Sequence, residues 1–396
     1  MSDAVFGSDP FAGRPGAVLT EEGIAHFGDP IREQRRLAAG EAVVPRADRA
    51  VIQVAGEDRL TWLDSITSQA LTALAPGDSA ELLVLDPQGR VEHAAGVLDD
   101  GVATWLLADG GDAPALAAWL SRMRFRARVE ISERPDLAIV GCAEAGGART
   151  RAELAAYRPH DVAVVWDDPW RRVAPGGWQY ATTPAHPGAA YTWTEIVVER
   201  AALRRLDDVE AAGLLAAEAL RIAAWRPRWS REVDDRSIPH EYDWLRSAVH
   251  LEKGCYRGQE TVAKVHNLGH PPRRLTLLHL DGSDSVLPER GAPVVQGSGP
   301  DGAPAEVGHV TSSALHHELG PIALAVLARR VPADAPLEVL ADGARIAAAQ
   351  EVIVPADAGA TAGVPRLTRL SRRPLADRGG SAPGAPSAGD AEPPAK

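Results

Sequence analysis

Residues 252–261 read EKGCYRGQET, and this stretch concentrates side chains that the rest of the chain almost lacks. The 396-residue chain has only three lysines and two cysteines, yet Lys253, Cys255 and Lys264 fall within twelve positions. Positive charge elsewhere comes almost entirely from arginine. The stretch is therefore the first candidate for a functional site.

The backbone on either side of this cysteine has a recognisable pattern. Gly254 and Gly258 free the chain for a tight turn. Residues 259–269, QETVAKVHNLG, have the pattern of a short helix that Gly269 ends. The sequence therefore predicts a glycine-rich turn that leads into a helix.

Cys255 would lie just ahead of this helix, with Lys253 and Arg257 two positions to either side. Nearby cations and a helix N-terminus both stabilise a thiolate, so one interpretation is a reactive cysteine. The other is a structural turn shaped by its glycines, in which Cys255 only fills space. Position alone does not choose between them.

Composition limits the classes of protein. With 396 residues, 45% of them apolar, the chain can form two or three structural units with real cores. It has no apolar run long enough for a membrane helix, and its first residues lack a signal-peptide layout and carry acids that disfavour a mitochondrial presequence. We therefore expect a cytoplasmic protein that does not bind membranes.

The two cysteines and the net charge narrow the chemistry further. Two cysteines are too few to hold a structural zinc or an iron–sulfur cluster alone, so no resident metal is expected. A formal net charge of −12 disfavours direct nucleic-acid binding.

The residue pattern divides the chain into five parts. Residues 1–25 are rich in small residues and are predicted to form a flexible arm. Residues 26–135 and 136–270 each mix strand-like alternation with amphipathic helices, as α+β domains do. Residues 271–355 carry short apolar runs between turns, as an antiparallel β-barrel does, and residues 356–396 have the composition of a disordered tail.

Several elements can be assigned individually. Residues 58–71 are predicted to form a helix that Asp58 caps, and residues 208–225 an amphipathic helix that must end before Pro227. Two strands are predicted to meet about a turn at residues 87–89. The first domain would then have the split βαβ order.

The loop and its surroundings resemble a known family. KGCYRGQE (253–260) is similar to the signature of the YgfZ-type proteins, folate-binding relatives of the glycine-cleavage T-protein (aminomethyltransferase) that assist the assembly or repair of iron–sulfur proteins. Residues 218–245, EALRIAAWRPRWSREVDDRSIPHEYDWL, and 261–282, TVAKVHNLGHPPRRLTLLHLDG, extend the resemblance, and WLDSITSQAL (62–71) matches a first-domain element more weakly. The similarity runs in order over roughly residues 49–354.

The resemblance implies an α+β fold of the aminomethyltransferase-like, folate-binding type, with two α+β domains and a C-terminal antiparallel β-barrel around a central hole. It implies tetrahydrofolate, or another reduced folate, as the ligand. Glu195 stands where the T-protein carries its pterin-pairing acid, and Arg221 and Trp225 would contact the glutamate tail and the ring. The ordinary alternatives are a solvated strand residue for Glu195, an ion pair with Glu218 for Arg221, and a core position for Trp225.

The resemblance also assigns roles within the loop. Cys255 would be the essential group, and Lys253 would tune or orient it. The other residues that would contact the cofactor or hold the loop are Gly254, Tyr256, Gly258, Gln259 and Glu260.

One position departs from the T-protein pattern. The T-protein places its catalytic acid in a Gly-Gly-x-x-Asp-Asp stretch, whereas residues 88–96, QGRVEHAAG, put His93 and Ala94 at the acidic pair. His93 could serve as a base, while Glu92 would point to the opposite face of a strand. Whether the chain is an enzyme therefore stays open.

Three hypotheses follow. The leading one is a tetrahydrofolate-binding accessory factor for the assembly or repair of iron–sulfur cluster proteins, which acts through Cys255 and has assembly proteins or client enzymes as partners. The alternative is a folate-dependent aminomethyltransferase or other one-carbon transfer enzyme that depends on His93 or Glu92. The third is a non-catalytic scaffold that binds a partner through the barrel and tail, for which Cys255 would not matter.

Overall fold

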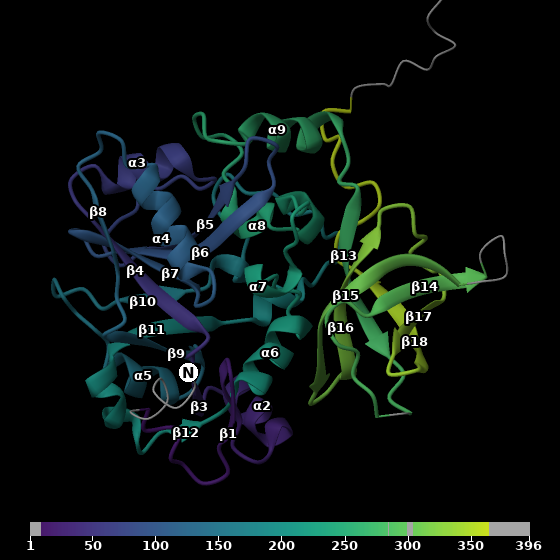
Figure 1. The fold of residues 1–396 in the computed structure, drawn as a ribbon, viewed down its shortest axis with the longest axis horizontal. Coiled ribbons are helices and arrows are strands. Elements are labelled where there is room, and N and C mark those ends of the chain that lie inside the picture. Colours follow the sequence, from purple (N-terminus) through teal and green to yellow (C-terminus); the bar gives the residue numbers. More distant parts are fainter. Residues whose placement is uncertain (1–8, 284, 299–303, 364–396) are drawn as a thin grey trace, which may run out of the picture. The chain divides into compact units, whose positions relative to one another are not determined.

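Two five-stranded sheets, a small two-stranded sheet and a closed six-stranded barrel organise the chain (Figure 1). The computed structural model describes residues 9–283, 285–298 and 304–363, and its elements belong to one unit that ends at Ala362. The predicted fold class, two α+β units followed by an antiparallel β-barrel, is confirmed. No helix in these described ranges is long and apolar enough to cross a membrane.

The first sheet has the strand order β5-β6-β7-β4-β8. Its strands are β4 (Arg49–Ala55), β5 (Ser79–Leu85), β6 (Val91–Asp99), β7 (Ala103–Asp109) and β8 (Glu130–Glu133). Helices α3 (Arg59–Ile66) and α4 (Ala113–Arg122) cover one face, where Leu63 and Leu116 share a buried cluster with strand residues such as Ile52. β5 and β6 pair about the turn that was predicted at residues 87–89.

The second sheet packs against the other face of the first. Its order is β10-β11-β9-β3-β12, with β3 (Ala42–Pro45), β9 (Leu137–Ala143), β10 (Val165–Asp167), β11 (Trp193–Glu199) and β12 (Glu210–Ala211). Trp105 of the first sheet and Val197 of the second share one buried cluster. Gly141 is required here, because a Cβ at this position would lie 2.2 Å from the ring of Trp193.

The remaining elements of the second domain lie around this sheet. They are α5 (Ala148–Glu153) and the 3₁₀ turns η1 (Pro169–Arg171), η2 (Pro187–Ala190) and η3 (Arg200–Leu206). Cys142 lies on the face toward α5 and is fully buried, as a small apolar side chain would be.

The N-terminal residues differ from their predicted arrangement in two ways. β3 was placed with the first domain, yet it pairs with β9 of the second. Residues 9–25 were predicted to be part of a flexible arm, but β1 (Val18–Thr20) and β2 (Gly23–His26) form a hairpin and Phe11 is fully buried. Helix α2 (Pro30–Ala38) then leads into β3, and residues 1–8 lie outside the described residues.

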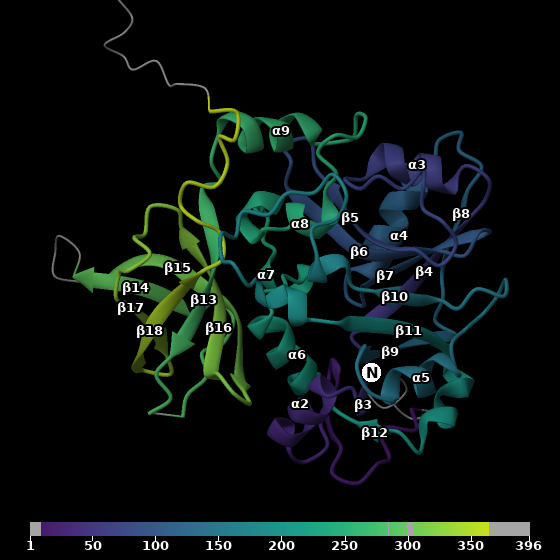
Figure 2. The same ribbon diagram turned by 180° about the vertical axis from the view of Figure 1, so that it is seen from behind.

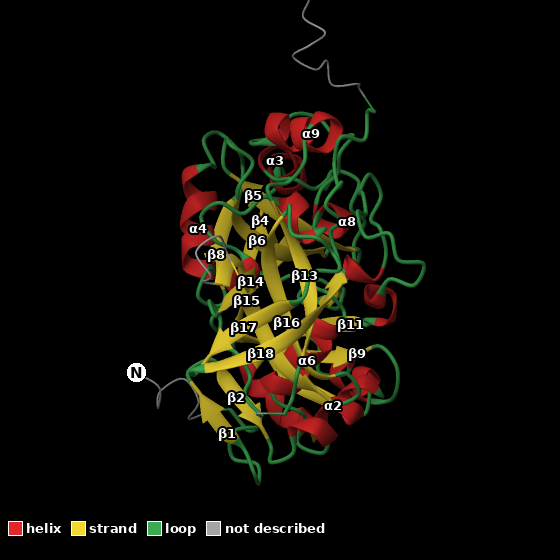
Figure 3. Ribbon diagram, turned by 90° about the vertical axis from the view of Figure 1, so that its right-hand side faces the viewer, coloured by secondary structure: helices red, strands yellow, loops and turns green. Residues whose placement is uncertain are grey.

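The C-terminal domain is the predicted antiparallel barrel, seen from the side in Figure 3. Its strands run in the order β13-β16-β15-β14-β17-β18, and pairing of β13 with β18 closes it. They are β13 (Arg273–Leu280), β14 (Pro293–Ser298), β15 (Pro304–His316), β16 (Gly320–Ala328), β17 (Leu337–Ala341) and β18 (Ala344–Val352).

A helical segment connects the second sheet to the barrel. It contains α6 (Leu214–Ala223), α7 (Trp229–Glu232), the 3₁₀ turn η4 (Pro239–Tyr242), α8 (Leu245–Ala248) and α9 (Gln259–Leu268). α6 packs against β15 and lies between the second sheet and the barrel (Figure 2). The helix predicted over residues 208–225 is shorter than expected, because residues 210–211 form β12, but it ends before Pro227 as predicted.

The first residues of the predicted tail pack against α9. The Thr361 hydroxyl donates to the His266 carbonyl at 3.0 Å, and Ala358 is buried. Residues 356–362 are therefore ordered by contacts, contrary to the expectation. The rest of that prediction, residues 364–396, lies outside the described residues.

Candidate functional site

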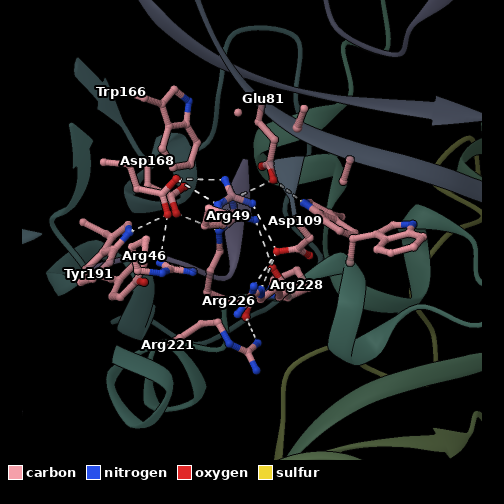
Figure 4. A pocket seen from close by; sticks show the side chains of 18 residues that line it. Arg46, Arg49, Glu81, Asp109, Trp166, Asp168, Tyr191, Arg221, Arg226 and Arg228 are labelled. Atoms are coloured by element: carbon pink, nitrogen blue, oxygen red, sulfur yellow. Dashed lines mark hydrogen bonds and ion pairs between the residues drawn. The ribbon is translucent and has the colours of Figure 1, made fainter. Parts of the chain in front are cut away.

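A polar pocket lies between the two sheets and the segment after α6 (Figure 4). It encloses about 500 Å³ of empty space, its opening included. Its aromatic walls are Trp166, Tyr191, Trp193, Trp229 and Trp244. Its charged side chains are Arg46, Arg49, Arg221, Arg226, Arg228, Glu81, Asp109, Asp168 and Glu195. We call it the central pocket.

A closed ring of alternating charges forms part of the wall. In order, it consists of Arg46, Asp48, Arg228, Asp109, Arg49 and Glu195. Arg46 binds Asp48 through two hydrogen bonds of 2.9 Å and Glu195 through one of 2.9 Å. We call this the charge ring.

The other side of the charge ring depends on two arginines. Arg228 lies 2.8 Å from Asp48 and donates to Asp109 at 2.7 Å, and Arg49 donates to Glu195 at 3.0 and 3.1 Å. A longer contact of 3.4 Å between Arg49 and Asp109 closes the ring. The charge ring thus ties the β3–β4 connection, the end of β7, β11 and the segment after α6 together.

The charge ring lowers the pKa of two of its buried acids, Asp48 and Asp109. Burial by itself would raise the pKa of Asp48, but the guanidiniums of Arg46 and Arg228 outweigh it and hold that pKa well below its usual range. Burial would raise the pKa of Asp109 in the same way, and Arg228 and Arg49 lower it instead. Asp48 and Asp109 are therefore ionised near neutral pH.

Two further arginines of the central pocket are paired separately. Arg226 donates to Asp168 at 2.9 Å and to Glu81 at 2.7 Å, and Trp244 donates to Glu81 at 2.9 Å. Burial raises the pKa of Asp168 although Arg226 opposes it. This second cluster joins β5 to the segments that follow β10 and α6.

Arg221 lines the central pocket and also binds the barrel. It donates to Glu218 at 2.5 and 2.9 Å, to Glu232 at 2.9 Å and to Ser312 of β15 at 2.7 Å. The ion pair with Glu218, which the sequence left as an alternative, is present. A contact of Arg221 with a ligand stays a prediction.

Trp225 does not line the central pocket. It is 2% exposed, has a positive φ of 61°, and packs edge-on against the ring of His186 at 5.2 Å. The prediction that Trp225 contacts the ligand ring is therefore not supported, and its alternative, a core position, is what the structure shows. The rings that do face the pocket include Trp193 and Trp229.

The cysteine loop has the predicted backbone. Cys255 is exposed, and α9 begins at Gln259 behind the positive-φ residue Gly258. A Cβ at Gly258 would lie 2.6 Å from the carbonyl oxygen of Asp86, so the loop rests directly on the β5–β6 turn. The Gln259 side chain donates to the Lys253 carbonyl at 3.1 Å and closes the loop.

Lys253 anchors the loop instead of facing the cysteine. Its ammonium group donates to the carbonyl oxygens of Asp64, Thr67 (3.0 Å) and Gln69 (2.7 Å) at the end of α3. Its side chain is 4% exposed, and burial lowers the pKa of Lys253. The role of Lys253 in orienting Cys255 stays a prediction, and these contacts would let Lys253 act only through the position of the loop.

Arg257 is engaged as well. It lies 2.5 Å from Glu92 of β6 and above the ring of Trp119 of α4. The two cations beside Cys255 in sequence therefore both bind the first domain. The loop is held from two sides, and its thiol is presented to solvent.

The other loop residues do not lie on the central pocket. The hydroxyl of Tyr256 is buried without a partner among the described residues, and burial raises its pKa. Gly254 is open to solvent, and the exposed carboxylate of Glu260 makes no hydrogen bond within the described ranges. The prediction that Gly254, Tyr256, Gly258, Gln259 and Glu260 contact the same ligand as Glu195 is not supported by this arrangement.

The comparisons with known proteins concern the fold and the sequence as a whole. No protein-family model matches the chain. Glycine cleavage system aminomethyltransferase T from Bartonella henselae superposes with a TM-score of 0.66 over 87% of this chain and 96% of that chain, at 16% sequence identity. This chain has the aminomethyltransferase fold.

In sequence, the chain is 23% identical to the iron-sulfur cluster assembly factor IBA57 homolog, mitochondrial, of Mycosarcoma maydis. The alignment of 252 residues covers 58% of this chain and 55% of that protein, so the chain spans about half the length of the curated relative it matches. The resemblance is thus confirmed: the fold is that of the T-protein, and the sequence is similar to that of an iron–sulfur cluster assembly factor.

β6 contains His93 and Ala94, the residues that the sequence resemblance places at the T-protein's acidic pair. Ala94 faces the central pocket, whereas His93 points to the other face and bonds Asp112 through Nδ1 at 2.7 Å. Glu92 faces Arg257, as the predicted strand alternation requires. Neither His93 nor Glu92 therefore presents a base to the pocket from this strand.

The central pocket contains the kinds of side chains that a reduced folate needs. Such a ligand needs a flat apolar slot, an acid for its ring N–H groups and cations for its carboxylates. The pocket offers ring faces, Glu195 and five arginines. Each of these arginines is already paired with an acid, since Asp48, Glu218 and Glu232 add to the four acids of the lining. Both oxygens of Glu195 are already bonded, to Arg46 and Arg49, so pairing with a pterin requires that one of them be released.

Most of the pocket's charged residues were not identified from the sequence. They are Arg46, Arg49, Glu81, Asp109, Asp168, Arg226 and Arg228. One signal was available, since residues 221–231 carry four arginines and two tryptophans directly behind an apolar helix. Such a cluster after a buried helix indicates a polar interior site better than a solvated surface.

Proposed function

We propose that this chain is an accessory factor for the assembly or repair of iron–sulfur proteins that acts in the cytoplasm, binds a reduced folate and uses Cys255 as its functional group. The name of the sequence relative supports the iron–sulfur role, and the aminomethyltransferase fold supports the folate. The observation that carries the proposal is a contrast between two positions. Ala94, one of the two residues that the resemblance places at the T-protein's acidic pair, faces the pocket without an acid, while Cys255 is exposed on a firmly anchored loop.

Different residues of the central pocket would contact different parts of the ligand. The ring of Trp193 or Trp229 would stack on the pterin, and Glu195 would accept hydrogen bonds from its N–H groups. Arg221 or Arg228 would hold a carboxylate of the glutamate tail. Tetrahydrofolate, when bound, would supply or accept a one-carbon unit.

The loop would act at a separate place on the surface. Cys255 would bind a cluster iron as a thiolate, with its proton released to solvent, or attack the outer sulfur of a partner's persulfide, whose inner sulfur would leave as a thiolate. Its side chain is exposed, and the loop that carries it is fixed by Lys253 and Gln259. Iron–sulfur assembly proteins or client enzymes would be the partners that approach it.

Complementation tests the role of Cys255. In a strain that lacks this protein, Cys255→Ser and Cys255→Ala should fail to restore the activity of iron–sulfur enzymes, whereas Cys142→Ala, at a buried cysteine, should restore it. His93→Ala should also restore it, because His93 faces α4. Full restoration of iron–sulfur enzyme activity by Cys255→Ala would refute the proposal and favour a scaffold. If His93→Ala failed to restore that activity while the Cys255 variants restored it, the one-carbon transfer enzyme would be favoured.

Calorimetry tests the ligand. We expect 5-formyltetrahydrofolate to bind the wild-type protein and to bind Glu195→Gln about tenfold more weakly, since a hydrogen bond to a charged group contributes about 1.5–3 kcal/mol. Glu199→Gln, an exposed residue on the same strand, is the matched control and should bind like the wild type. Equal affinity of all three proteins, or no binding by the wild type, would exclude the central pocket as a folate site.

A further inference from the structure

An exposed turn between α4 and β8 has a composition that the central pocket and the cysteine loop do not explain. Residues 121–128 read SRMRFRAR. Phe125 is 81% exposed, more than any other large apolar side chain in the described part of the chain. Its φ of +43° is unusual for a residue with a bulky side chain. An apolar ring is therefore displayed to solvent in a conformation that does not favour it.

The base of this turn is firmly held. The amide of Ala127 donates to the Arg124 carbonyl at 2.8 Å, which closes the turn under Phe125. Arg128 donates to Asp58 through its backbone amide and its guanidinium, at 2.8 Å each. The fixed base presents the ring outward at a defined place.

Three arginines lie within three positions of Phe125 in the sequence and have no partner in the described part of the chain. Arg122, Arg124 and Arg126 are exposed and form no ion pair or side-chain hydrogen bond there, whereas Arg128 is paired with Glu57 and Asp58. The positive charge is local, since the whole chain has a formal net charge of −12.

A shallow depression lies beside the turn. It is lined by Ala55, Gly56 and residues 124–130, and its open volume is about 700 Å³. The backbone of Arg128 can lie against Gly56 because that residue has no side chain, and a Cβ there would be 2.1 Å from the Arg128 carbonyl oxygen. The turn thus combines an apolar anchor, three free cations and space for a bound segment.

We propose that residues 122–126 form a docking surface for an acidic protein segment that carries an apolar side chain. Phe125 would pack on the apolar side chain, and the free guanidiniums would bind carboxylates, which matches the aromatic and arginine residues that dominate binding energy at protein interfaces. Charge complementarity would speed the encounter and select the partner.

A protein partner fits this surface better than a nucleic acid or a lipid bilayer. A nucleic-acid site needs a track of cations along the phosphate backbone, but only three free arginines lie on this one turn, and Glu130 and Glu133 follow on β8. The net charge of −12 also repels an extended polyanion or an anionic membrane. A short acidic segment needs only the local patch.

Fluorescence anisotropy tests the proposal with the full-length protein. The probe is a fluorescein-labelled peptide with three glutamates on each side of one leucine, at low ionic strength. We expect saturable binding that weakens at least fivefold with Phe125→Ala and at least tenfold with the triple variant R122E/R124E/R126E.

Two matched controls separate docking from general attraction. R204E/R205E reverses the charge of two exposed arginines that have no aromatic residue beside them in the sequence. Leu154→Ala truncates an apolar side chain that is 71% exposed. Both should bind the peptide as the wild type does. The proposal is wrong if R204E/R205E weakens peptide binding as much as the triple variant does, or if Phe125→Ala has no effect on it. It is also wrong if an oligothymidylate or a phosphatidylserine vesicle binds the protein more tightly than the peptide does.

Discussion

The carboxylate of Glu195 is paired with two guanidiniums, so its replacement should lower the free energy of unfolding. Glu195→Gln would remove the negative charge between Arg46 and Arg49 in a site where all three side chains are at most 11% exposed. Removal of one member of a buried ion pair typically costs about 3–5 kcal/mol, so the free energy of unfolding should fall by about 3 kcal/mol without any ligand. Urea unfolding would measure it.

The control for this substitution lies on the same strand. Glu199→Gln changes an exposed side chain at the end of β11 and should leave stability within about 0.5 kcal/mol of the wild type. If Glu195→Gln were equally harmless, the charge ring would contribute little to stability, and Glu195 would be retained for a ligand alone.

The charge ring contains ion pairs that cannot be predicted from the sequence around either partner. Glu195 was selected through the family resemblance, but its partner Arg46 is 149 positions away, and no local pattern links the two. Cys255, in contrast, was identified correctly as part of a glycine-shaped turn before a helix, because all the residues that define that turn are neighbours in the chain. A turn formed by neighbouring residues was thus predictable from the sequence, whereas an ion pair between distant residues was not.

At the scale of elements, α9 depends on the residue that precedes it. Gly258 has φ +87°, and a Cβ there would meet the Asp86 carbonyl oxygen at 2.6 Å. Gly258→Ala should therefore displace the cysteine loop from the β5–β6 turn and lower the free energy of unfolding by at least about 1–2 kcal/mol. Differential scanning calorimetry and the complementation assay would show both effects.

Gly254→Ala is the matched control four residues earlier. Gly254 has open space around its Cβ position and no positive φ, so an added methyl group should change neither stability nor complementation. Equal tolerance of the two substitutions would mean that the loop does not need its contact with the turn.

Helices and strands with a clear hydrophobic periodicity were predicted. Elements whose length or pairing depends on residues far away in the sequence were not. The β5–β6 pair and the barrel strands follow from alternation and turn residues. The helix predicted over residues 58–71 ends at Ile66, and Asp58 bonds Arg128 instead of capping it. β3 was assigned to the wrong domain because its partner β9 lies about 95 residues later, beyond the reach of any local pattern.

At the scale of the whole molecule, one buried acid makes stability depend on pH. Asp243 lies in the interior near His186 and Arg246, and burial raises the pKa of Asp243 to about 7 from 3.8. Between these two values the native state holds a proton that the unfolded chain has lost, so stability should fall as the pH rises from about 4 to about 7. The contribution of one such group is at most about 1.4 kcal/mol per pH unit.

Asp243→Asn should remove this part of the pH dependence, because asparagine does not ionise. The variant should gain stability relative to the wild type between pH 4 and pH 7, by a total of about 1 kcal/mol or more, in chemical unfolding at both pH values. Asp342→Asn, at an exposed turn residue with positive φ, is the control and should follow the wild-type profile. Parallel profiles for Asp243→Asn and the wild type would contradict the expectation.

The position of β3 has a consequence for synthesis on the ribosome. All five strands of the first sheet lie between residues 49 and 133, whereas the second sheet needs β3 at residues 42–45 and β12 at residues 210–211. The nascent chain can thus complete its first sheet before β9 has emerged from the ribosome. Until then β3, although synthesised earlier, has no strand to pair with. Because domains fold as units during translation, the first domain serves as the nascent surface on which the second is assembled.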